Sequence, residues 1–258
     1  MNLKRNDTTR AALVLFAAAA LIMIVVTLTN RGDITSATLV LGSVSAFIAG
    51  IFLLTFAKEE PLDMRFTSLL PVQGTLGIAR ICADLGLQGN AHMVPAADET
   101  ADPSVTQVVP VANYRPLTPA DGYSFVTGRD GNGVVITPLG YPLLRMLEES
   151  SDLRLPGDEE EVLAAIKEVC EEVLEVAGRV DAERAGDSIV VELSEFRLLQ
   201  GCRAVQSESP KACLICPCPV CSLIACMLAK GTGRACTIEQ VTVEPGSETL
   251  RLILSVVP

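Results

Sequence analysis

The chain has 258 residues, a formal net charge of −11 and a mean hydropathy of +0.41, which is high for a water-soluble protein. Tryptophan is absent and aromatic residues make up 4% of the chain, so it offers few platforms on which bases could stack. An acidic chain without a basic cluster also repels a phosphate backbone. These features exclude nucleic acid as a partner.

Two uncharged stretches near the start, residues 11–30 and 34–57, predict a transmembrane helical hairpin. At a rise of 1.5 Å per residue, each forms a helix of about 30 Å or more, enough to cross the hydrocarbon core of a bilayer. The first apolar run is too long for a signal peptide, and no small-residue cleavage site follows it. We therefore expect residues 1–57 to anchor the chain, with the bilayer as a partner.

The charges that flank the two spans predict the orientation of the hairpin. Basic residues are more numerous outside the spans (Lys4, Arg5 and Arg10 before them, Lys58 and Arg65 after them) than in the loop between them (Arg31). The positive-inside rule then places both termini inside a multi-pass cell-membrane protein, with a cytoplasmic soluble domain. Neither span contains an ionisable residue, which favours an anchor over a transporter.

Small residues recur at four-residue spacing in the second span, at Gly42, Ala46 and Gly50. Such a stripe lets another helix approach closely. Its expected partner is the first span, at residues 17–20, and a homo-oligomer formed through the same three residues is the alternative.

The rest of the chain predicts a linker at residues 58–67 and a soluble domain at residues 68–258, with a sub-boundary near residues 150–157. In chain order we expect a helix at 72–87, strands at 91–94 and 105–111, a hairpin at 123–127 and 134–137, helices at 141–149 and 158–177, strands at 180–184 and 188–193, a helix at 219–230, and strands at 236–243 and 249–257. This order predicts an α+β fold, with a mixed, mostly antiparallel sheet and helices on one face.

Local signals support several of these elements. Asp158 can cap a helix whose first turn carries three glutamates, and Gly178 follows its end. Leucines alternate with other residues along 250–256, the period of a half-buried strand. The glycine-rich segment 128–133 is typical of a tight turn, and it lacks the glutamate that a calcium-binding EF-hand loop requires.

Five of the nine cysteines crowd into a short segment, and four of them form two fused C-x-x-C pairs: Cys213, Cys216, Cys218 and Cys221. Four thiolates can hold zinc or an iron–sulfur cluster, and Cys202, just upstream, could replace one inner ligand. The spacing differs from the zinc-ribbon and ferredoxin templates. In a cytoplasmic domain, reduced cysteines are expected rather than disulfides.

Two other interpretations of these cysteines stay open. Cys218-Pro219-Val220-Cys221 lies where the last helix should begin, and a helix N-terminus stabilises a thiolate, so thiol–disulfide exchange by Cys218 and Cys221 is a catalytic alternative. These four residues resemble the C-P-x-C of glutaredoxins. The cysteines could also pack simply as small apolar residues, as expected for Cys82, Cys170, Cys226 and Cys236. The single histidine, His92, is expected to be structural.

Residues 158–257 resemble the vinyl-reductase-type small-molecule-binding domain. The similarity rests on a helix, the hairpin around Gly186-Asp187, a cysteine-led helix from Cys221 to Leu228, and a closing hairpin. It implies binding of a small hydrophobic ligand, or of a metal through cysteines. The cysteine usual in that family's last strand is missing, since Thr249-Leu250-Arg251-Leu252 stands there. The whole chain resembles uncharacterised two-span membrane proteins of methanogenic archaea.

The leading hypothesis is a membrane-anchored, cytoplasmic ligand- or metal-binding domain that acts as a sensor or scaffold. The sequence contains no G-x-S-x-G, Walker-type or dinucleotide-binding motif, which favours a non-enzymatic role. A membrane-bound thiol oxidoreductase and a structural interaction module are the alternatives.

Overall fold

The computed structural model describes residues 3–29, 34–56, 63–98, 101–115, 124–128, 131–151, 153–244 and 246–257. The chain divides into two compact units, Met1–Leu62 and Asp63–Pro258. The interspan loop and the first half of the expected linker, residues 58–62, lie outside the described residues. The described part of that linker includes the start of α3 (Met64–Leu69), so helix begins there earlier than the sequence predicted.

The first unit consists of two long apolar helices, α1 (Leu3–Thr29) and α2 (Ile34–Phe56). Residues 11–29 and 35–55 within them are long and apolar enough to cross a membrane, as the sequence predicted. The helices pack through Gly50, whose missing Cβ would lie 2.8 Å from the ring of Phe16. Gly42, at the other end of the small-residue stripe, meets nothing within 4 Å. Homo-oligomerisation through this stripe stays a prediction.

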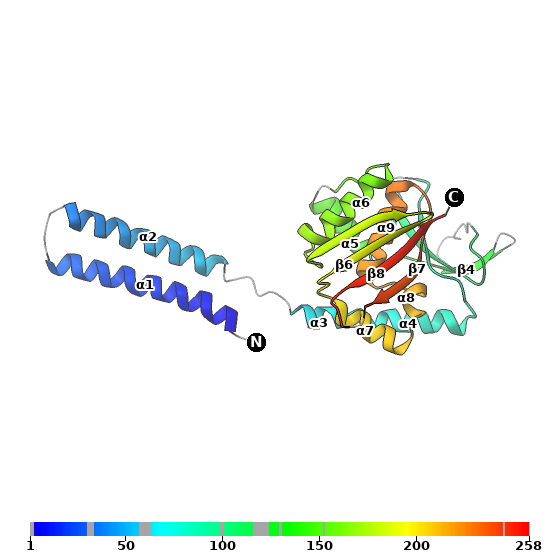
Figure 1. Cartoon of the computed structure of the whole chain (residues 1–258), viewed down its shortest axis with the longest axis horizontal. Coiled ribbons are helices and arrows are strands. Elements are labelled where there is room, and N and C mark those ends of the chain that lie inside the picture. The colour runs from blue at the N-terminus through cyan, green and yellow to red at the C-terminus, as the bar shows by residue number, and fades with distance from the viewer. Residues whose placement is uncertain are drawn as a thin grey trace. The chain divides into compact units, whose positions relative to one another are not determined.

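The second unit is built on an eight-stranded antiparallel sheet, which confirms the predicted α+β class (Figure 1). Its strand order is β3-β4-β2-β1-β7-β8-β6-β5. The strands are β1 (His92–Pro95), β2 (Val105–Pro110), β3 (Phe125–Gly128), β4 (Gly131–Ile136), β5 (Arg179–Ala185), β6 (Ser188–Ser194), β7 (Cys236–Val243) and β8 (Leu250–Val256).

The sheet has two four-stranded halves that meet where β1 pairs with β7, with His92 opposite Thr237 and Met93 opposite Cys236. In the C-terminal half, buried side chains of β6 and β8 face each other in register, for example Val191 opposite Leu252. This alternation turns one face of the sheet toward the helices, the arrangement that the period-two pattern predicted.

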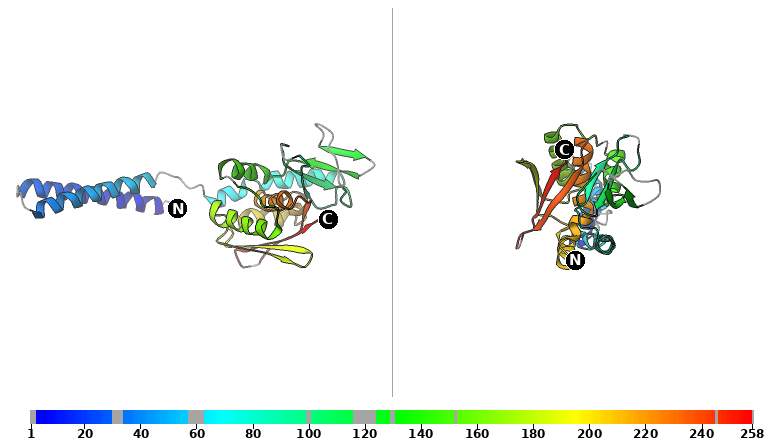
Figure 2. Two further views of the ribbon diagram at one scale, coloured as in Figure 1. Left: turned by 90° about the horizontal axis from the view of Figure 1, so that it is seen from above. Right: turned by 90° about the vertical axis from the view of Figure 1, so that its right-hand side faces the viewer.

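The helices are α4 (Val72–Asp84), α5 (Tyr141–Ser150), α6 (Glu159–Glu168), α7 (Leu199–Glu208), α8 (Ala212–Ile215) and α9 (Pro219–Thr232), in addition to α3. Figure 1 shows β6, β8 and β7 passing in front of α9, and the two turned views in Figure 2 show α9 within the body of the unit. Helix α9 contacts α5, α6, β1 and β7, and all ten residues from Val220 to Ala229 are buried. It is the core helix of the unit.

Residues 212–232 also pass a length-and-composition test for a membrane span. In the structure this stretch is interrupted at Cys216–Cys218 and is largely buried. Its apolar character is that of a helix enclosed by protein on all sides.

The structure corrects two expectations about helices. The single helix predicted at 158–177 ends its α-helical part at Glu168 and continues as a π-helical turn, Val169–Val173. There the Glu171 carboxylate accepts a hydrogen bond from the Val180 amide, and the Cys170 carbonyl accepts from Val176 and Ala177, so the chain turns into β5. Helices α7 and α8 were not predicted.

Candidate functional site

The cysteine-rich segment forms the junction between α8 and α9. Cys213 lies on α8, Cys216 follows its last residue, and Cys218 is the N-cap residue of α9. Pro219 occupies the first turn, where a missing N–H costs nothing, so α9 begins where the sequence predicted. Cys221 lies in the same turn, on a buried face.

The sheet holds this junction in place. The Gln107 side-chain amide of β2 donates to the carbonyl of Ile215 (2.9 Å), and the Ala91 amide donates to the carbonyl of Leu214 (2.8 Å). On the opposite side, the amide of Gly140 donates to the Ser222 hydroxyl (3.0 Å). A Cβ at Gly140 would lie 2.2 Å from the backbone nitrogen of Leu223, so only glycine allows this close approach to α9.

Cys218 forms a thiol cluster with Cys202 of α7 and Cys221 of α9. Hydrogen bonds from the Cys202 and Cys221 thiols lower the pKa of Cys218 well below its ordinary value, against the effect of burial. The amides of Val220 and Cys221 add to this shift, although Cys218 makes no N-cap hydrogen bond of standard geometry. The pKa values of Cys202 and Cys221 are raised in turn, because each donates to Cys218. The cluster therefore favours one thiolate, on Cys218.

The other cysteines remain protonated thiols at neutral pH. Burial raises the pKa of Cys213 and of Cys216 to about 12, and the charge on Cys218 adds to both shifts. Cys82, Cys170, Cys226 and Cys236 are fully buried among apolar side chains, as their sequence patterns predicted. All nine cysteines are free.

Metal binding by Cys213, Cys216, Cys218 and Cys221 stays a prediction. The described part of the chain contains no group of three or more His, Cys, Asp or Glu residues that could hold a metal ion. The thiol cluster instead pairs Cys218 with Cys202, the residue that the sequence singled out only as a substitute ligand.

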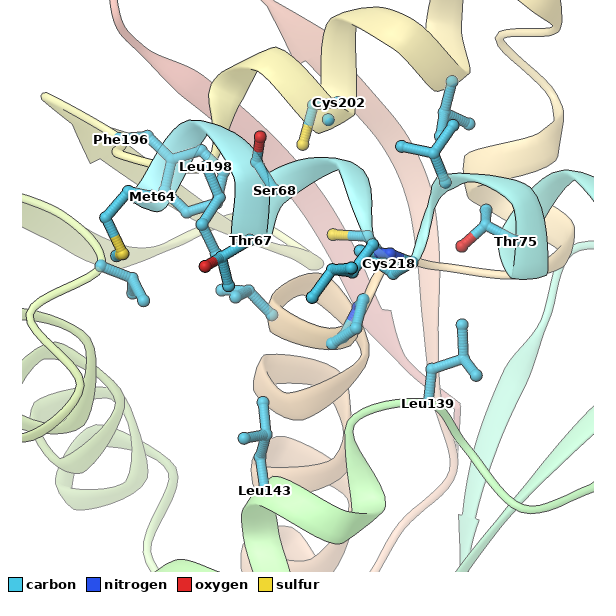
Figure 3. Close-up of a pocket in the computed structure, with 18 of the residues that line it drawn as sticks. Met64, Thr67, Ser68, Thr75, Leu139, Leu143, Phe196, Leu198, Cys202 and Cys218 are labelled. Atoms are coloured by element: carbon cyan, nitrogen blue, oxygen red, sulfur yellow. The ribbon is translucent and has the colours of Figure 1, made fainter. Parts of the chain in front are cut away.

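An apolar pocket of about 580 Å³ opens beside the thiol cluster (Figure 3). None of the described residues that line it is Asp, Glu, Lys, Arg or His. They come from five separate parts of the chain: Met64, Thr67, Ser68, Leu70, Pro71, Val72 and Thr75; Leu139 and Leu143; Leu174 and Val176; Phe196, Leu198, Gly201, Cys202 and Val205; and Cys218, Pro219 and Val220.

Few polar groups face this pocket, and one of them has no partner. The Thr75 hydroxyl is fully buried and makes no hydrogen bond with the described part of the chain. Thr75 is one of the residues that line the cavity. Figure 3 shows it on the side of α4 nearer Cys218. A buried hydroxyl without a partner costs free energy. Cys218 is half-buried and completes the polar part of the wall.

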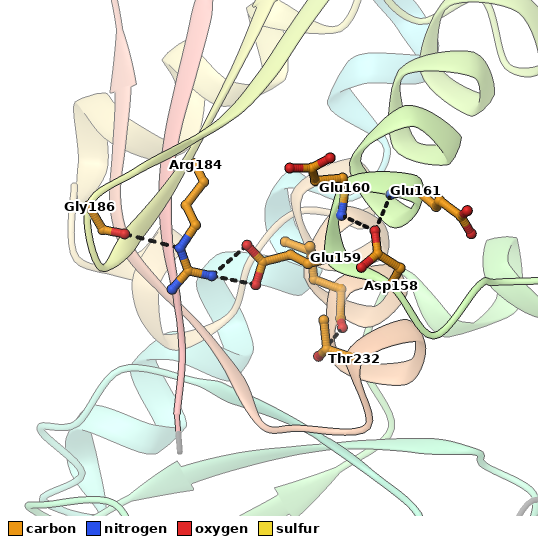
Figure 4. A network of polar contacts seen from close by, with 8 residues as sticks. Asp158, Glu159, Glu160, Glu161, Arg184, Gly186 and Thr232 are labelled. Atoms are coloured by element: carbon orange, nitrogen blue, oxygen red, sulfur yellow. Dashed lines mark hydrogen bonds and ion pairs between the residues drawn. The ribbon is translucent and has the colours of Figure 1, made fainter.

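A larger depression, of about 690 Å³, lies between α6 and β5. Part of its charge is already paired, as Figure 4 shows. Both oxygens of the Glu159 carboxylate accept from Arg184 (2.6 Å each), and Asp158 caps α6 by accepting from the amides of Glu160 and Glu161. This network stabilises the start of α6. The apolar pocket is therefore the better candidate for a ligand-binding site.

His92 lies away from this pocket, in β1. Its ring stacks on Tyr114 with centroids 4.0 Å apart, and Nδ1 is 2.8 Å from the Asn90 carbonyl oxygen. Burial lowers its pKa. Both contacts agree with the structural role that the sequence predicted.

Comparison with known proteins adds a family but no activity. A family model described as "Domain of unknown function (DUF7982)" matches residues 1–253. The chain belongs to the DUF7982 family. The match includes both apolar helices, so the hairpin is part of what the DUF7982 family shares. No curated protein and no solved structure matches this DUF7982 chain.

Proposed function

We propose that this DUF7982 protein is a membrane-anchored ligand-binding protein, a sensor or scaffold that takes a small hydrophobic molecule into the apolar pocket. The observation that carries the proposal is the pocket of about 580 Å³, whose lining is mostly apolar and includes the half-buried Cys218. A mostly apolar cavity of this size with a few placed polar groups is typical of small-molecule sites.

Two further arguments agree with this proposal. The resemblance of residues 158–257 to the vinyl-reductase-type domain implies a hydrophobic ligand. The two apolar helices would hold the soluble unit at a membrane, and their flanking basic residues favour a cytoplasmic location for it. A ligand-binding domain in that position can report on small molecules inside the cell.

Photolabelling of the full-length protein in lipid nanodiscs tests the proposal. An alkyl diazirine should label peptides of the pocket wall, in addition to the two apolar helices. The variant Leu143→Trp fills the pocket from α5, and labelling of residues 64–75 and 218–220 should fall several-fold. The control Met146→Trp changes the same helix at an exposed position outside the pocket and should leave labelling unchanged. Unlabelled pocket peptides in the wild type, or equal labelling in both variants, would refute the proposal.

A second function, thiol–disulfide exchange, is favoured by the pairing of Cys218 with Cys221. The first is half-buried at a helix N-terminus with a lowered pKa, and the second is buried and donates to it. The Cys218 thiolate would attack a substrate disulfide, releasing one substrate thiolate. The Cys221 thiol, which is protonated in the resting protein, would give its proton to the released substrate thiolate. The resulting Cys221 thiolate would attack the mixed disulfide at Cys218, releasing the second substrate thiolate and leaving an oxidised Cys218–Cys221 pair.

Trapping separates this function from ligand binding. With a small aromatic disulfide as substrate, a Cys221→Ser variant should accumulate the mixed disulfide at Cys218, and a Cys218→Ser variant should form none. If the wild type releases no substrate thiol under anaerobic conditions, the exchange function is wrong, and the ligand proposal is unaffected.

A further inference from the structure

Helix α3 presents an apolar face that the described residues of the second unit leave exposed. Phe66, Leu69 and Leu70 lie at i, i+3 and i+4 spacing, which places them on one stripe. Their exposed fractions are 60%, 43% and 63%. Three large apolar side chains side by side in water favour an interaction site.

The opposite face of α3 is fixed to the protein. Ser68 is buried against α7, where a Cβ on Gly201 would lie 2.1 Å from the Ser68 carbonyl oxygen. Asp63 caps the helix by accepting from the Arg65 amide (2.9 Å). The exposed stripe is therefore held on a rigid support, as a docking surface requires.

The chain itself limits what can cover this stripe. Helix α2 ends at Phe56 and α3 begins at Met64, so eight residue steps separate them. A fully extended chain spans at most about 3.6 Å per residue, so α3 begins within about 29 Å of the end of α2. If α2 spans a bilayer, the stripe is tethered at the membrane surface.

The charges around the stripe indicate the chemistry of the contact. Two basic residues near it, Lys58 and Arg65, are outnumbered by Glu59, Glu60 and Asp63. Attraction to anionic headgroups therefore cannot drive docking, and insertion of apolar side chains must do so.

We propose that the α3 stripe (Phe66, Leu69 and Leu70) docks into the interface of the bilayer that holds α1 and α2, through apolar insertion. Leu70 belongs both to the stripe and to the pocket wall. Docking would therefore place one side of the pocket at the lipid, and its ligand would come from the membrane. This last consequence rests on the proposed function, whereas the docking itself does not.

The absence of tryptophan from the sequence provides a direct test, because each introduced tryptophan is a unique reporter. The full-length protein is reconstituted in phosphatidylcholine vesicles, with and without lipids brominated on their acyl chains. Phe66→Trp is the test variant and Phe52→Trp, within α2, is the positive control. Phe125→Trp is the negative control, since Phe125 is 45% exposed on β3, far along the chain from the hairpin.

Docking predicts blue-shifted emission from Phe66→Trp and quenching by brominated lipid that approaches that of Phe52→Trp. Quenching of Phe125→Trp should be several-fold weaker. Adding 20% anionic lipid or raising the salt concentration should change the Phe66→Trp signal little.

Emission typical of water, with quenching equal to that of Phe125→Trp, would overturn the proposal. So would a blue shift that brominated lipid does not quench and that disappears on dilution, because a second protein copy would then cover the stripe. If quenching occurs while photolabelling of the pocket fails, docking stands and the ligand function falls.

Discussion

Alkylation of the native protein should modify Cys218 before any other cysteine. Thiolates, and not thiols, react with iodoacetamide, so the rate follows the ionised fraction and access to it. Cys218 is half-buried at the pocket and has a lowered pKa, whereas the other eight cysteines are buried. The reason for the selectivity lies in the hydrogen bonds that Cys218 accepts from Cys202 and Cys221.

The ionised fractions of the thiols set a lower limit on how much faster Cys218 is alkylated than the buried cysteines. Thiols with a pKa of about 12, such as Cys213 and Cys216, are ionised to only about one part in 10⁵ at pH 7. A thiol at the ordinary value of 9.0 would be ionised to about 1%, and Cys218 exceeds that. Intrinsic nucleophilicity falls with pKa at a Brønsted slope of about 0.5, which removes about 30-fold of the resulting 10³-fold advantage. Cys218 should therefore react at least about 30-fold faster, before its better access is counted.

Mass spectrometry of peptides after brief alkylation at several pH values measures this preference in the full-length protein. Labelling of Cys218 should level off below pH 9, whereas Cys213 and Cys216 should still be gaining reactivity at pH 10. Cys202→Ala removes one thiol donor, so the Cys218 midpoint should move to higher pH. Cys236→Ala removes a remote buried thiol and should leave that midpoint unchanged. Equal rates at Cys218 and Cys213, or a Cys218 midpoint at or above pH 9, would refute the proposed thiolate.

Two predictions concern stability, each measured by denaturant unfolding of the second unit within the full chain. Gly201→Ala should destabilise the unit by about 1–3 kcal/mol, because its Cβ would meet the Ser68 carbonyl oxygen. The control Gly74→Ala, on an open helix face, should stabilise it by up to about 1 kcal/mol. Equal changes in the free energy of unfolding would show that α3 and α7 can move apart at little cost. Leu223→Ala should destabilise the unit by about 2–5 kcal/mol, because Leu223 is fully buried in α9. The control Leu69→Ala, at an exposed position, should change stability by less than about 0.5 kcal/mol. A small effect at Leu223 would contradict the placement of α9 in the core.

Much of this architecture follows from local patterns. Alternation along residues 250–256 predicts β8, and Asp158 followed by three glutamates predicts the start of α6. Pro219 predicts the first residue of α9, and Cys218 therefore falls on its N-cap. These signals act within a few residues, so the sequence alone is sufficient to locate them.

The elements that were missed depend on tertiary contacts. Helix α7 contains Gly201, which disfavours helix by itself, and the reason for that glycine is the Ser68 carbonyl oxygen of α3, more than 100 residues earlier in the chain. The π-helical turn at Val169–Val173 likewise depends on the bond between Glu171 and Val180. Neither contact follows from the helical pattern of the residues around it.

The pocket could not be predicted for the same reason. Thr75 lies in an ordinary helical pattern, and only the approach of α7 and the start of α9 makes this residue part of a cavity wall. Cys202 was recognisable as a cysteine near the cluster, but its pairing with Cys218 is a tertiary contact between α7 and the N-cap residue of α9. The sequence thus drew attention to the cysteine-rich segment without locating the cavity beside it.

The thiol pKa values also rank the possible roles of these cysteines. Packing accounts for Cys236, which is buried with its pKa raised, but a packing role gives no reason for a lowered pKa at half-buried Cys218. A metal held by the four predicted cysteines would require thiolates at Cys213 and Cys216, whose pKa values of about 12 are each about 3 above the ordinary one. Deprotonating both thiols at neutral pH costs free energy that the bound metal would have to supply. A single thiolate at a pocket carries no such penalty, so this chemistry favours a bound molecule or a thiol exchange over a four-cysteine metal site.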